Sequence, residues 1–322
     1  MKNNKKNGIL VLIIILIIAV ISAVLGFVFP AEKKNGFKTR ENPNIQYIME
    51  KKSRNGYLAS IYINGVIQTE NAEYNQKWLL QTISQLKNDK NNKGIVIIMN
   101  SPGGAVYEAD EAYLAFQDYK TTGKPVYVYQ EHLAASGGYY ISCAANKIYA
   151  NRNTLTGSIG VISGSSYDLT GLFDKLGIKS ETIHSGKNKN MFSINEKVTD
   201  EQRKIMQSIS DECYEQFTAI VSVNRNIPLS EVKKIADGRI YTANQALQNG
   251  LIDGIDTKEG MLSIMYKDCF NGQELPVIDF KYEKNQTFRD YLFGTLFKGE
   301  EKKAFNKFLA ETTLQYPAFL YN

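Results

Sequence analysis

The chain is poor in histidine, cysteine and tryptophan. It has two histidines, three cysteines and one tryptophan in 322 residues. The cysteines, at positions 143, 213 and 269, are odd in number and show no CxxC spacing, which argues against a disulfide framework. Structural zinc sites are built from four cysteine or histidine ligands at short spacings, so this composition argues against one as well.

Basic residues do not form a cluster. The net charge is +5 and the pI is about 8.8, but the lysines are spread along the chain. No group of lysines and arginines is interleaved with aromatic residues, so the sequence lacks the pattern of a nucleic-acid-binding surface. The chain has no internal repeat, and its 43% hydrophobic and 22% charged residues are typical of a globular protein.

A long apolar run occupies the N-terminus. Residues 9–29 are almost entirely apolar, and three lysines precede them within the first six residues. A membrane-spanning helix needs about 20 apolar residues, whereas the apolar core of a cleaved signal peptide has about 7–15. Lysines on both sides of the run leave its orientation open under the positive-inside rule. We expect an N-terminal segment at 1–7, a transmembrane anchor at 8–29 and a polar stalk at 30–55.

Beyond the stalk, apolar runs alternate with amphipathic segments. Residues 94–99 (GIVIIM) are continuously apolar, as in a strand that is covered on both faces. Thr199 and Gln202 form a capping-box pattern at the start of a long amphipathic helix. Residues 178–184 are interpreted as a further strand. The alternation predicts an α/β domain at 56–270, followed by a divergent tail at 271–322.

Two glycine-containing segments indicate acyl-transfer chemistry. Ser136 lies in AASGG at 134–138, between an apolar strand and a helix of small residues, where its hydroxyl is little crowded. A second glycine turn, NSPGG at 100–104, has backbone N–H groups that can stabilise an oxyanion. A serine hydroxyl is a weak nucleophile until a neighbouring base accepts its proton.

The residues alone leave this base open between histidine and lysine. His132 and His184 lie in no distinctive motif, and the GxSxG elbow is absent because an alanine stands two residues before Ser136. Lys187 and Lys189 follow His184 closely. An amine acts as a base only when its surroundings lower its pKa from about 10.4.

Five segments stand in an order that is characteristic of one peptidase family. They are NSPGG at 100–104, AASGGYYIS at 134–142, TGSIGVISG at 156–164, SGKNK at 185–189 and GRIYTANQALQNGLIDGI at 238–255. In these segments the chain resembles the signal peptide peptidase A family of serine–lysine peptidases (family S49), in its short, membrane-anchored bacterial form. The resemblance spans about residues 55–270.

The resemblance also implies the roles of four residues. By position they are Ser136 as the nucleophile, Lys189 as the general base, Gly103 as an oxyanion-hole glycine and Ser158 as the serine that orients the lysine. Lys187 does not match the position of the base. The two residues after Lys189 depart from the family pattern, so the conformation of their loop is not implied.

The resemblance also implies the fold, the substrates and the location of the whole protein. The fold would be a ClpP/crotonase-like spiral of β-β-α units with additional C-terminal helices. The activity would be that of a serine endopeptidase on remnant signal peptides and other apolar peptides, without a cofactor, a metal or a nucleic acid. Short family members form rings, octamers by resemblance, in which adjacent protomers can share the dyad. The catalytic domain would lie on the extracytoplasmic side of the cytoplasmic membrane, held by one membrane span, with residues 1–7 in the cytoplasm.

Two other functions are compatible with such a fold. A crotonase-like enzyme acting on acyl-CoA would share the glycine oxyanion hole but would need no serine–lysine pair. A non-catalytic membrane scaffold would need neither. A Ser-His-Asp peptidase is a third arrangement, and it would require His132 or His184. Labelling of an activated serine separates the first two functions from a peptidase, and replacing the histidines tests the third.

Overall fold

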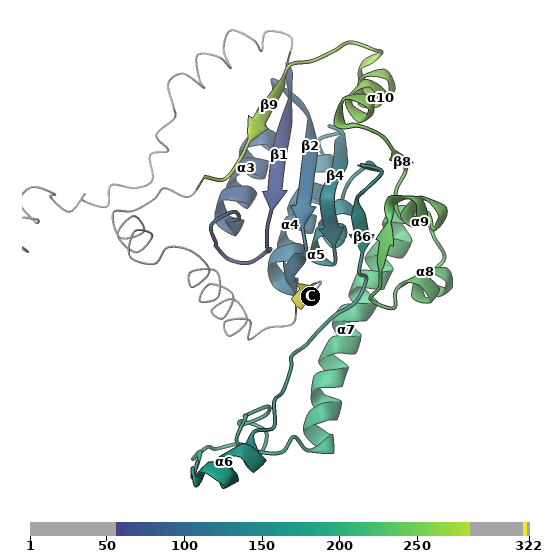
Figure 1. Cartoon of the computed structure of the whole chain (residues 1–322). Helices are drawn as coiled ribbons and strands as arrows, with labels where there is room; N and C mark the ends of the chain where they lie inside the picture. The colour runs from purple at the N-terminus through teal and green to yellow at the C-terminus, as the bar shows by residue number, and fades with distance from the viewer. Residues whose placement is uncertain (1–55, 284–317, 321–322) are drawn as a thin grey trace, which may run out of the picture. The chain divides into compact units, whose positions relative to one another are not determined.

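The structure is a computed structural model, and it describes residues 56–283 and the backbone of residues 318–320 (Figure 1). The anchor expected at 8–29, the stalk expected at 30–55 and residues 284–317 of the tail lie outside the described residues. Within residues 56–283, no helix is long and apolar enough to cross a membrane.

A largely parallel sheet forms the centre of the described chain (Figure 1). Its strand order is β7-β6-β4-β2-β1-β9, and β5 pairs with β4 and β8. In this sheet β6 and β7 are antiparallel, while the other pairs are parallel. The strands of this sheet are β1 (Tyr57–Asn64), β2 (Asn92–Ser101), β4 (Val126–Ala135), β5 (Lys147–Ala150), β6 (Leu155–Gly157), β7 (Ile240–Thr242), β8 (Gly254–Ile255) and β9 (Val277–Phe280). The short strand β3 (Gly103–Ala105) lies outside it.

Helices alternate with these strands, which confirms the predicted α/β class. The order β2, β3, α4 gives one of the expected β-β-α units. β9 comes from the predicted tail and pairs with β1, so the sheet includes residues beyond 270. The helices are α3 (Gln76–Asn88), α4 (Val106–Lys120), α5 (Gly137–Ser142), α6 (Thr170–Leu176), α7 (Asp200–Arg225), α8 (Leu229–Ile235), α9 (Ala243–Gln248) and α10 (Lys258–Phe270).

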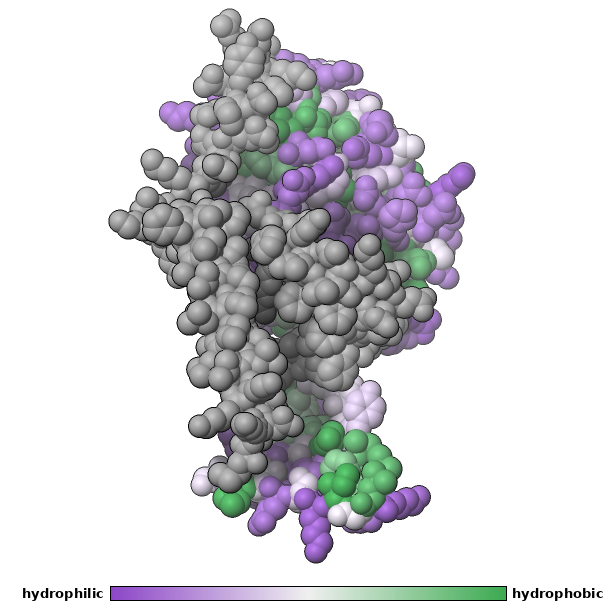
Figure 2. Space-filling view, turned by 60° about the vertical axis from the view of Figure 1, so that its left-hand side comes forward, coloured by the Kyte–Doolittle hydropathy of each residue, from purple (hydrophilic) through white to green (hydrophobic). Residues whose placement is uncertain are grey.

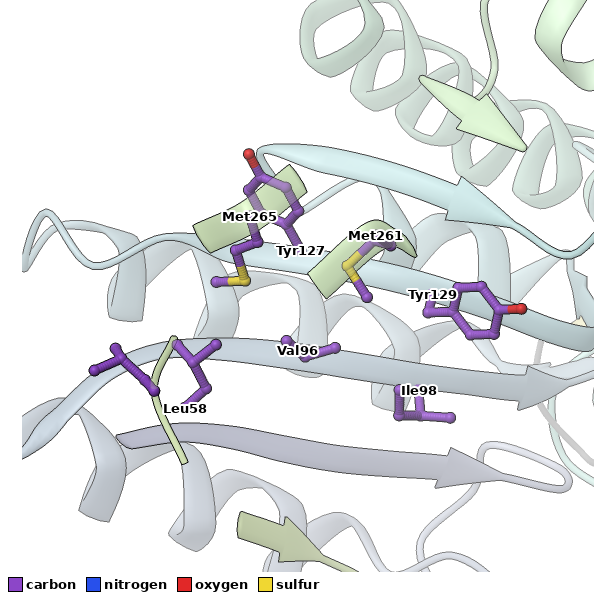
Figure 3. Close-up of a cluster of buried hydrophobic side chains, with 8 residues drawn as sticks. Leu58, Val96, Ile98, Tyr127, Tyr129, Met261 and Met265 are labelled. Carbon is purple, nitrogen blue, oxygen red and sulfur yellow. The ribbon is translucent and has the colours of Figure 1, made fainter. Parts of the chain in front are cut away.

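The central strand β2 is buried on both faces, as its continuous apolar run predicts. Successive side chains of a strand point to opposite faces of the sheet. Val96 and Ile98 point to the face that α10 covers, and the buried Ile97 points to the other, where Figure 1 shows α3 and α4. Figure 3 shows the α10 side of this core, which contains Leu58, Val96, Ile98, Tyr127, Tyr129, Met261, Met265 and Leu275.

The long helix α7 begins where the sequence predicts. The Thr199 hydroxyl accepts the backbone N–H of Gln202, and the Gln202 side chain accepts the N–H of Thr199. The strand predicted at 178–184 is wrong, because these residues lie in an exposed segment without a pairing strand. Apolar residues are not enough to form a strand when no neighbour supplies the hydrogen bonds of a ladder.

A buried ion pair joins the end of α7 to the sheet. Arg225 Nη1 lies 2.8 Å from the Asp253 carboxylate, which also accepts the N–H of Ile148. Burial acts to raise the pKa of Asp253, but the hydrogen bond and charge of Arg225 outweigh it, so the pKa lies below its usual range.

Replacing Asp253 with asparagine is expected to lower the free energy of unfolding by about 3 kcal/mol at pH 7, because Arg225 is left buried without its counter-ion. A carboxylate whose pKa is depressed on folding stabilises the fold above its unfolded pKa of about 3.9. That stabilisation is lost as the pH falls through the lower folded value. Urea unfolding at pH 7 and pH 3 should therefore give a smaller difference between the two proteins at pH 3, and equal differences would contradict this account.

Candidate active site

Three parallel strands end side by side at the candidate site. Ser101 of β2 is paired with Ala134 of β4, and Ala134 is paired with Thr156 of β6. Neighbouring strands lie about 4.8 Å apart, and ligands of α/β sheets bind at the carboxyl ends of the strands. Three of the four predicted site residues follow this row by two positions each, namely Gly103, Ser136 and Ser158.

Ser136 occupies a strained turn between β4 and α5. Its φ of 55° is uncommon for a residue with a side chain. The turn is held by two backbone hydrogen bonds, one from its N–H to Gly157 at 2.7 Å and one from Tyr140 to its carbonyl at 2.8 Å. Ser136 is only 1% exposed, and its hydroxyl has no hydrogen-bond partner among the described residues. The arrangement therefore leaves the hydroxyl free to meet a base.

Tyr140 fixes helix α5 behind the serine. Its hydroxyl donates to Asp110 of α4 at 2.6 Å and accepts from Gln216 of α7 at 2.6 Å. Its ring lies against those of Tyr113 and Phe217, with centroids 5.6 and 5.0 Å apart. Burial, followed by the hydrogen bond to Asp110, raises the pKa of Tyr140, so the phenol stays neutral. Tyr140 is fully buried and belongs to the core.

The strand β3 carries the predicted oxyanion glycine. Ile67 lies beside this strand. Its N–H donates to the Gly103 carbonyl and its carbonyl accepts the N–H of Ala105, both at 2.8 Å. Gly103 has a φ of 102°, a conformation that favours glycine. A Cβ on Gly104 would lie 1.8 Å from the Ile67 carbonyl oxygen. The two glycines are thus needed for different reasons. Gly103 is needed for its backbone angle, and Gly104 is needed because the Ile67 carbonyl approaches it closely.

The other edge of β3 pairs with the C-terminal end of the chain. The strand β10 (Ala318–Leu320) is antiparallel to β3, with Leu320 opposite Gly103 and Ala318 opposite Ala105. This edge of β3 therefore accepts an extended peptide by backbone pairing, a common mode of peptide recognition.

Ser158 lies at the mouth of a groove beside α7. Its φ is 50°, and its N–H donates to the Arg239 carbonyl at 2.8 Å. The groove has a volume of about 370 Å³, and Asp211 and Tyr214 of α7 line it together with Ser158. Ser158 thus lines this groove and directly follows Gly157, whose carbonyl accepts the N–H of Ser136.

Lys189 lies far from the other three residues. It is exposed in the segment between α6 and α7, beside Lys187, which forms a salt bridge with Glu201 in the first turn of α7. Phe217, which contacts the core behind Ser136, lies sixteen residues further along α7, a rise of about 24 Å at 1.5 Å per residue. Figure 1 shows this segment next to α6, at the far end of α7. One chain therefore does not bring Lys189 to Ser136.

The histidines do not approach Ser136 either. His132 is exposed on β4 and lines a separate cavity with Glu131. His184 is exposed in the same segment as Lys189, with its Nδ1 3.2 Å from the Gly186 carbonyl oxygen. Among residues 56–283, no side chain stands in the position of a base for the serine.

Sequence reasoning did not identify several residues that build the site. Ile67 supports β3, while Asp110 and Gln216 hold Tyr140 from two different helices. Each acts across a long sequence separation and lies in no local motif. The sequence alone contains no signal that identifies these residues, because only the folded chain brings them together.

A strained serine and a glycine-rich strand at the carboxyl end of a parallel sheet fit a serine hydrolase. The family model of peptidase family S49 matches residues 118–269. A putative signal peptide peptidase SppA of Enterococcus faecium is 38% identical over 228 residues, which are 68% of this chain and 66% of the relative. A putative protease of Synechocystis is 34% identical over 202 residues, 63% of this chain and 70% of the relative.

The chain belongs to peptidase family S49. Protease 4 of Haemophilus influenzae is a more distant relative, 29% identical over 77% of this chain but only 40% of its own length. Among solved structures, a ClpP1 mutant from Listeria monocytogenes has a TM-score of 0.45 and 17% identity, and the match covers 68% of this chain and 99% of that one.

Proposed function

We propose that this peptidase is a membrane-anchored serine endopeptidase with Ser136 as its nucleophile and Lys189 of a neighbouring copy as its general base. The N–H of Gly103 stabilises the oxyanion, and Ser158 orients the incoming lysine. The observation that carries the proposal is the register of β2, β4 and β6. Gly103, Ser136 and Ser158 each lie two residues beyond the row in which these strands are paired.

Two observations support a neighbouring copy as the source of the lysine. In its own chain, Lys189 lies in the segment that Lys187 ties to Glu201, and Phe217 in the core behind Ser136 is a rise of about 24 Å further along α7. The segment that carries it is also rich in exposed apolar residues, which Figure 2 shows as a green area at the lower end, where α6 lies in Figure 1. An exposed apolar patch of this kind marks an interface. It includes Leu172 and Leu176 of α6, together with Ile178 and Ile183 of the segment that follows α6.

The chemistry follows from these positions. Neutral Lys189 takes the proton of the Ser136 hydroxyl, and the serine oxygen attacks the peptide carbonyl carbon. The negative charge that forms on the carbonyl oxygen is stabilised by the N–H of Gly103. Protonated Lys189 gives its proton to the leaving amine, and water then hydrolyses the acyl-enzyme.

The substrates we propose are remnant signal peptides and other apolar peptides at the membrane. The name of the Enterococcus faecium relative supports this substrate class. The antiparallel pairing of β10 with residues 103–105 supports binding of a substrate in extended form at the same edge of β3, in place of β10. Residues 8–29 would anchor the enzyme by a single span, with the catalytic domain outside the cytoplasm and the copies assembled in a ring, as an octamer by resemblance.

The test is labelling of the full-length, assembled protein with a serine-directed fluorophosphonate. Wild-type protein and a Lys187→Ala control should label, whereas Ser136→Ala and Lys189→Ala should not. Equal labelling of Lys189→Ala would move the base elsewhere. No labelling of assembled wild-type protein would contradict the proposal, and acyl-CoA binding or peptide binding without turnover would then separate an acyl-CoA enzyme from a scaffold.

Removing the last five residues, 318–322, is expected to lower the KM for peptides, because β10 occupies the edge of β3 that a substrate would use. If the tail covers that edge two-thirds of the time, KM should fall about threefold. A chain that lacks only residues 321 and 322 keeps β10 and is the matched control. An unchanged KM in the longer deletion would show that the tail and the substrate do not compete.

A further inference from the structure

The side chain of Ser101 connects two turns at the end of β2. Ser101 is fully buried, and its hydroxyl donates to the Gly65 carbonyl at 2.6 Å. The same oxygen accepts the N–H of Gly103 at 3.1 Å. Because its one proton is committed to Gly65, the hydroxyl presents a lone pair to Gly103 and holds that N–H in one direction.

Ser101 also touches the helix that follows the nucleophile. It is paired with Ala134 of β4, two residues before Ser136. A Cβ placed on Gly138 would lie 3.0 Å from the Ser101 carbonyl oxygen and 3.4 Å from its Cβ. Ser101 therefore contacts the oxyanion strand on one side and the start of α5 on the other.

We propose that Ser101 is a positioning residue that holds the oxyanion donor of Gly103, an inference that rests on the proposed function. A buried N–H needs an acceptor, and in the free enzyme the Ser101 oxygen supplies it. The bond of 3.1 Å is at the long end for an N–H donor. A backbone N–H can be shared between two acceptors, so a negatively charged oxyanion beside Gly103, which is a stronger acceptor than a hydroxyl, takes a second bond from this N–H while Ser101 keeps the strand in place.

A positioning role for Ser101 and an ordinary turn-forming role predict different measurable effects of its replacement. A residue that only stabilises the turn would affect the unfolding temperature, and any loss of rate would follow that loss of stability. A residue that aims the oxyanion donor affects the step in which the oxyanion forms, because preorganised donors act on the transition state. Binding of the peptide in its ground state should then be unchanged.

The experiment compares wild type, Ser101→Ala and Ser101→Cys as full-length, assembled proteins. The second-order rate of fluorophosphonate labelling reports formation of the oxyanion-like adduct. We expect Ser101→Ala to label about 10- to 100-fold more slowly, below the 10²–10³-fold cost of losing an oxyanion donor completely. Ser101→Cys retains a weak acceptor and should lie between the two.

Peptide affinity, measured with each change placed in a Ser136→Ala background, should be the same for all three. Labelling of Ser101→Ala at the wild-type rate would overturn the inference, and so would a loss of rate that comes with equal losses of peptide affinity and thermal stability. The proposed function is judged separately in the same experiment. It fails if wild-type protein is not labelled at Ser136, and it stands if that labelling requires Lys189, whatever Ser101→Ala shows.

Discussion

Ser136→Ala and Lys189→Ala, each inactive when it assembles alone, are expected to regain peptidase activity when the two are co-expressed. Loss of a nucleophile or its base costs a serine peptidase on the order of 10⁴- to 10⁶-fold in kcat. In a ring built from both variants, some sites combine the intact serine of one copy with the intact lysine of its neighbour. With random mixing at equal amounts, about a quarter of the sites are complete, because neighbours in a ring meet through one repeated interface.

The measurement is the rate of cleavage of an apolar fluorogenic peptide by the purified mixed assembly. Lys187→Ala is the matched control, since Lys187 lies two residues from Lys189 but is bound to Glu201 in its own chain. The Lys187→Ala protein should be active without co-expression of a second variant. A mixed assembly without activity, despite proven incorporation of both variants, would mean that each chain supplies its own lysine and that the segment between α6 and α7 moves to reach Ser136.

Gly104→Ala is expected to reduce kcat by about 10²- to 10³-fold, the cost of a misplaced oxyanion donor. The methyl group would lie 1.8 Å from the Ile67 carbonyl oxygen, so β3 and the neighbouring Gly103 must shift. The φ of Gly104 is not positive, so alanine adds no backbone strain of its own. The loss therefore reports the close approach of Ile67 to β3.

Gly171→Ala in α6 is the matched control, because no atom lies within 4 Å of a Cβ at that position. Because α6 carries part of the apolar patch that we propose as the interface, the assembly size of Gly171→Ala is measured first, and protein that assembles like wild type should keep its activity. Circular dichroism and the assembly size of Gly104→Ala should stay close to wild type, since β3 is a short strand beside the main sheet. Full activity of Gly104→Ala would show that the position of β3 does not control the reaction.

Local patterns predicted the parts of this fold that depend on local physics. The apolar run at 94–99 gave the central strand β2, and the capping box at Thr199 gave the start of α7. The strand predicted at 178–184 failed because its apolar residues are exposed beside α6. A strand depends on a partner, and the sequence of one segment does not contain its partner.

The arrangement of the candidate site could be predicted from the sequence only in part. The motifs around Gly103, Ser136 and Ser158 identified residues that the sheet register places together. The distance of Lys189 and the supporting role of Ile67 depend on contacts between separate elements. Such contacts are set by how helices and strands pack, and they cannot be predicted from the hydrophobic periodicity of one sequence.

If Ser136 meets Lys189 only from a neighbouring copy, as we propose, proteolysis depends on concentration. A single newly made copy would carry a nucleophile without its base, so it would be harmless to the proteins around it until it met others of its kind. Specific activity should then fall on dilution below the dissociation constant of the assembly, without any loss of folded protein. A cell could then set the onset of this activity by the amount of the enzyme it makes.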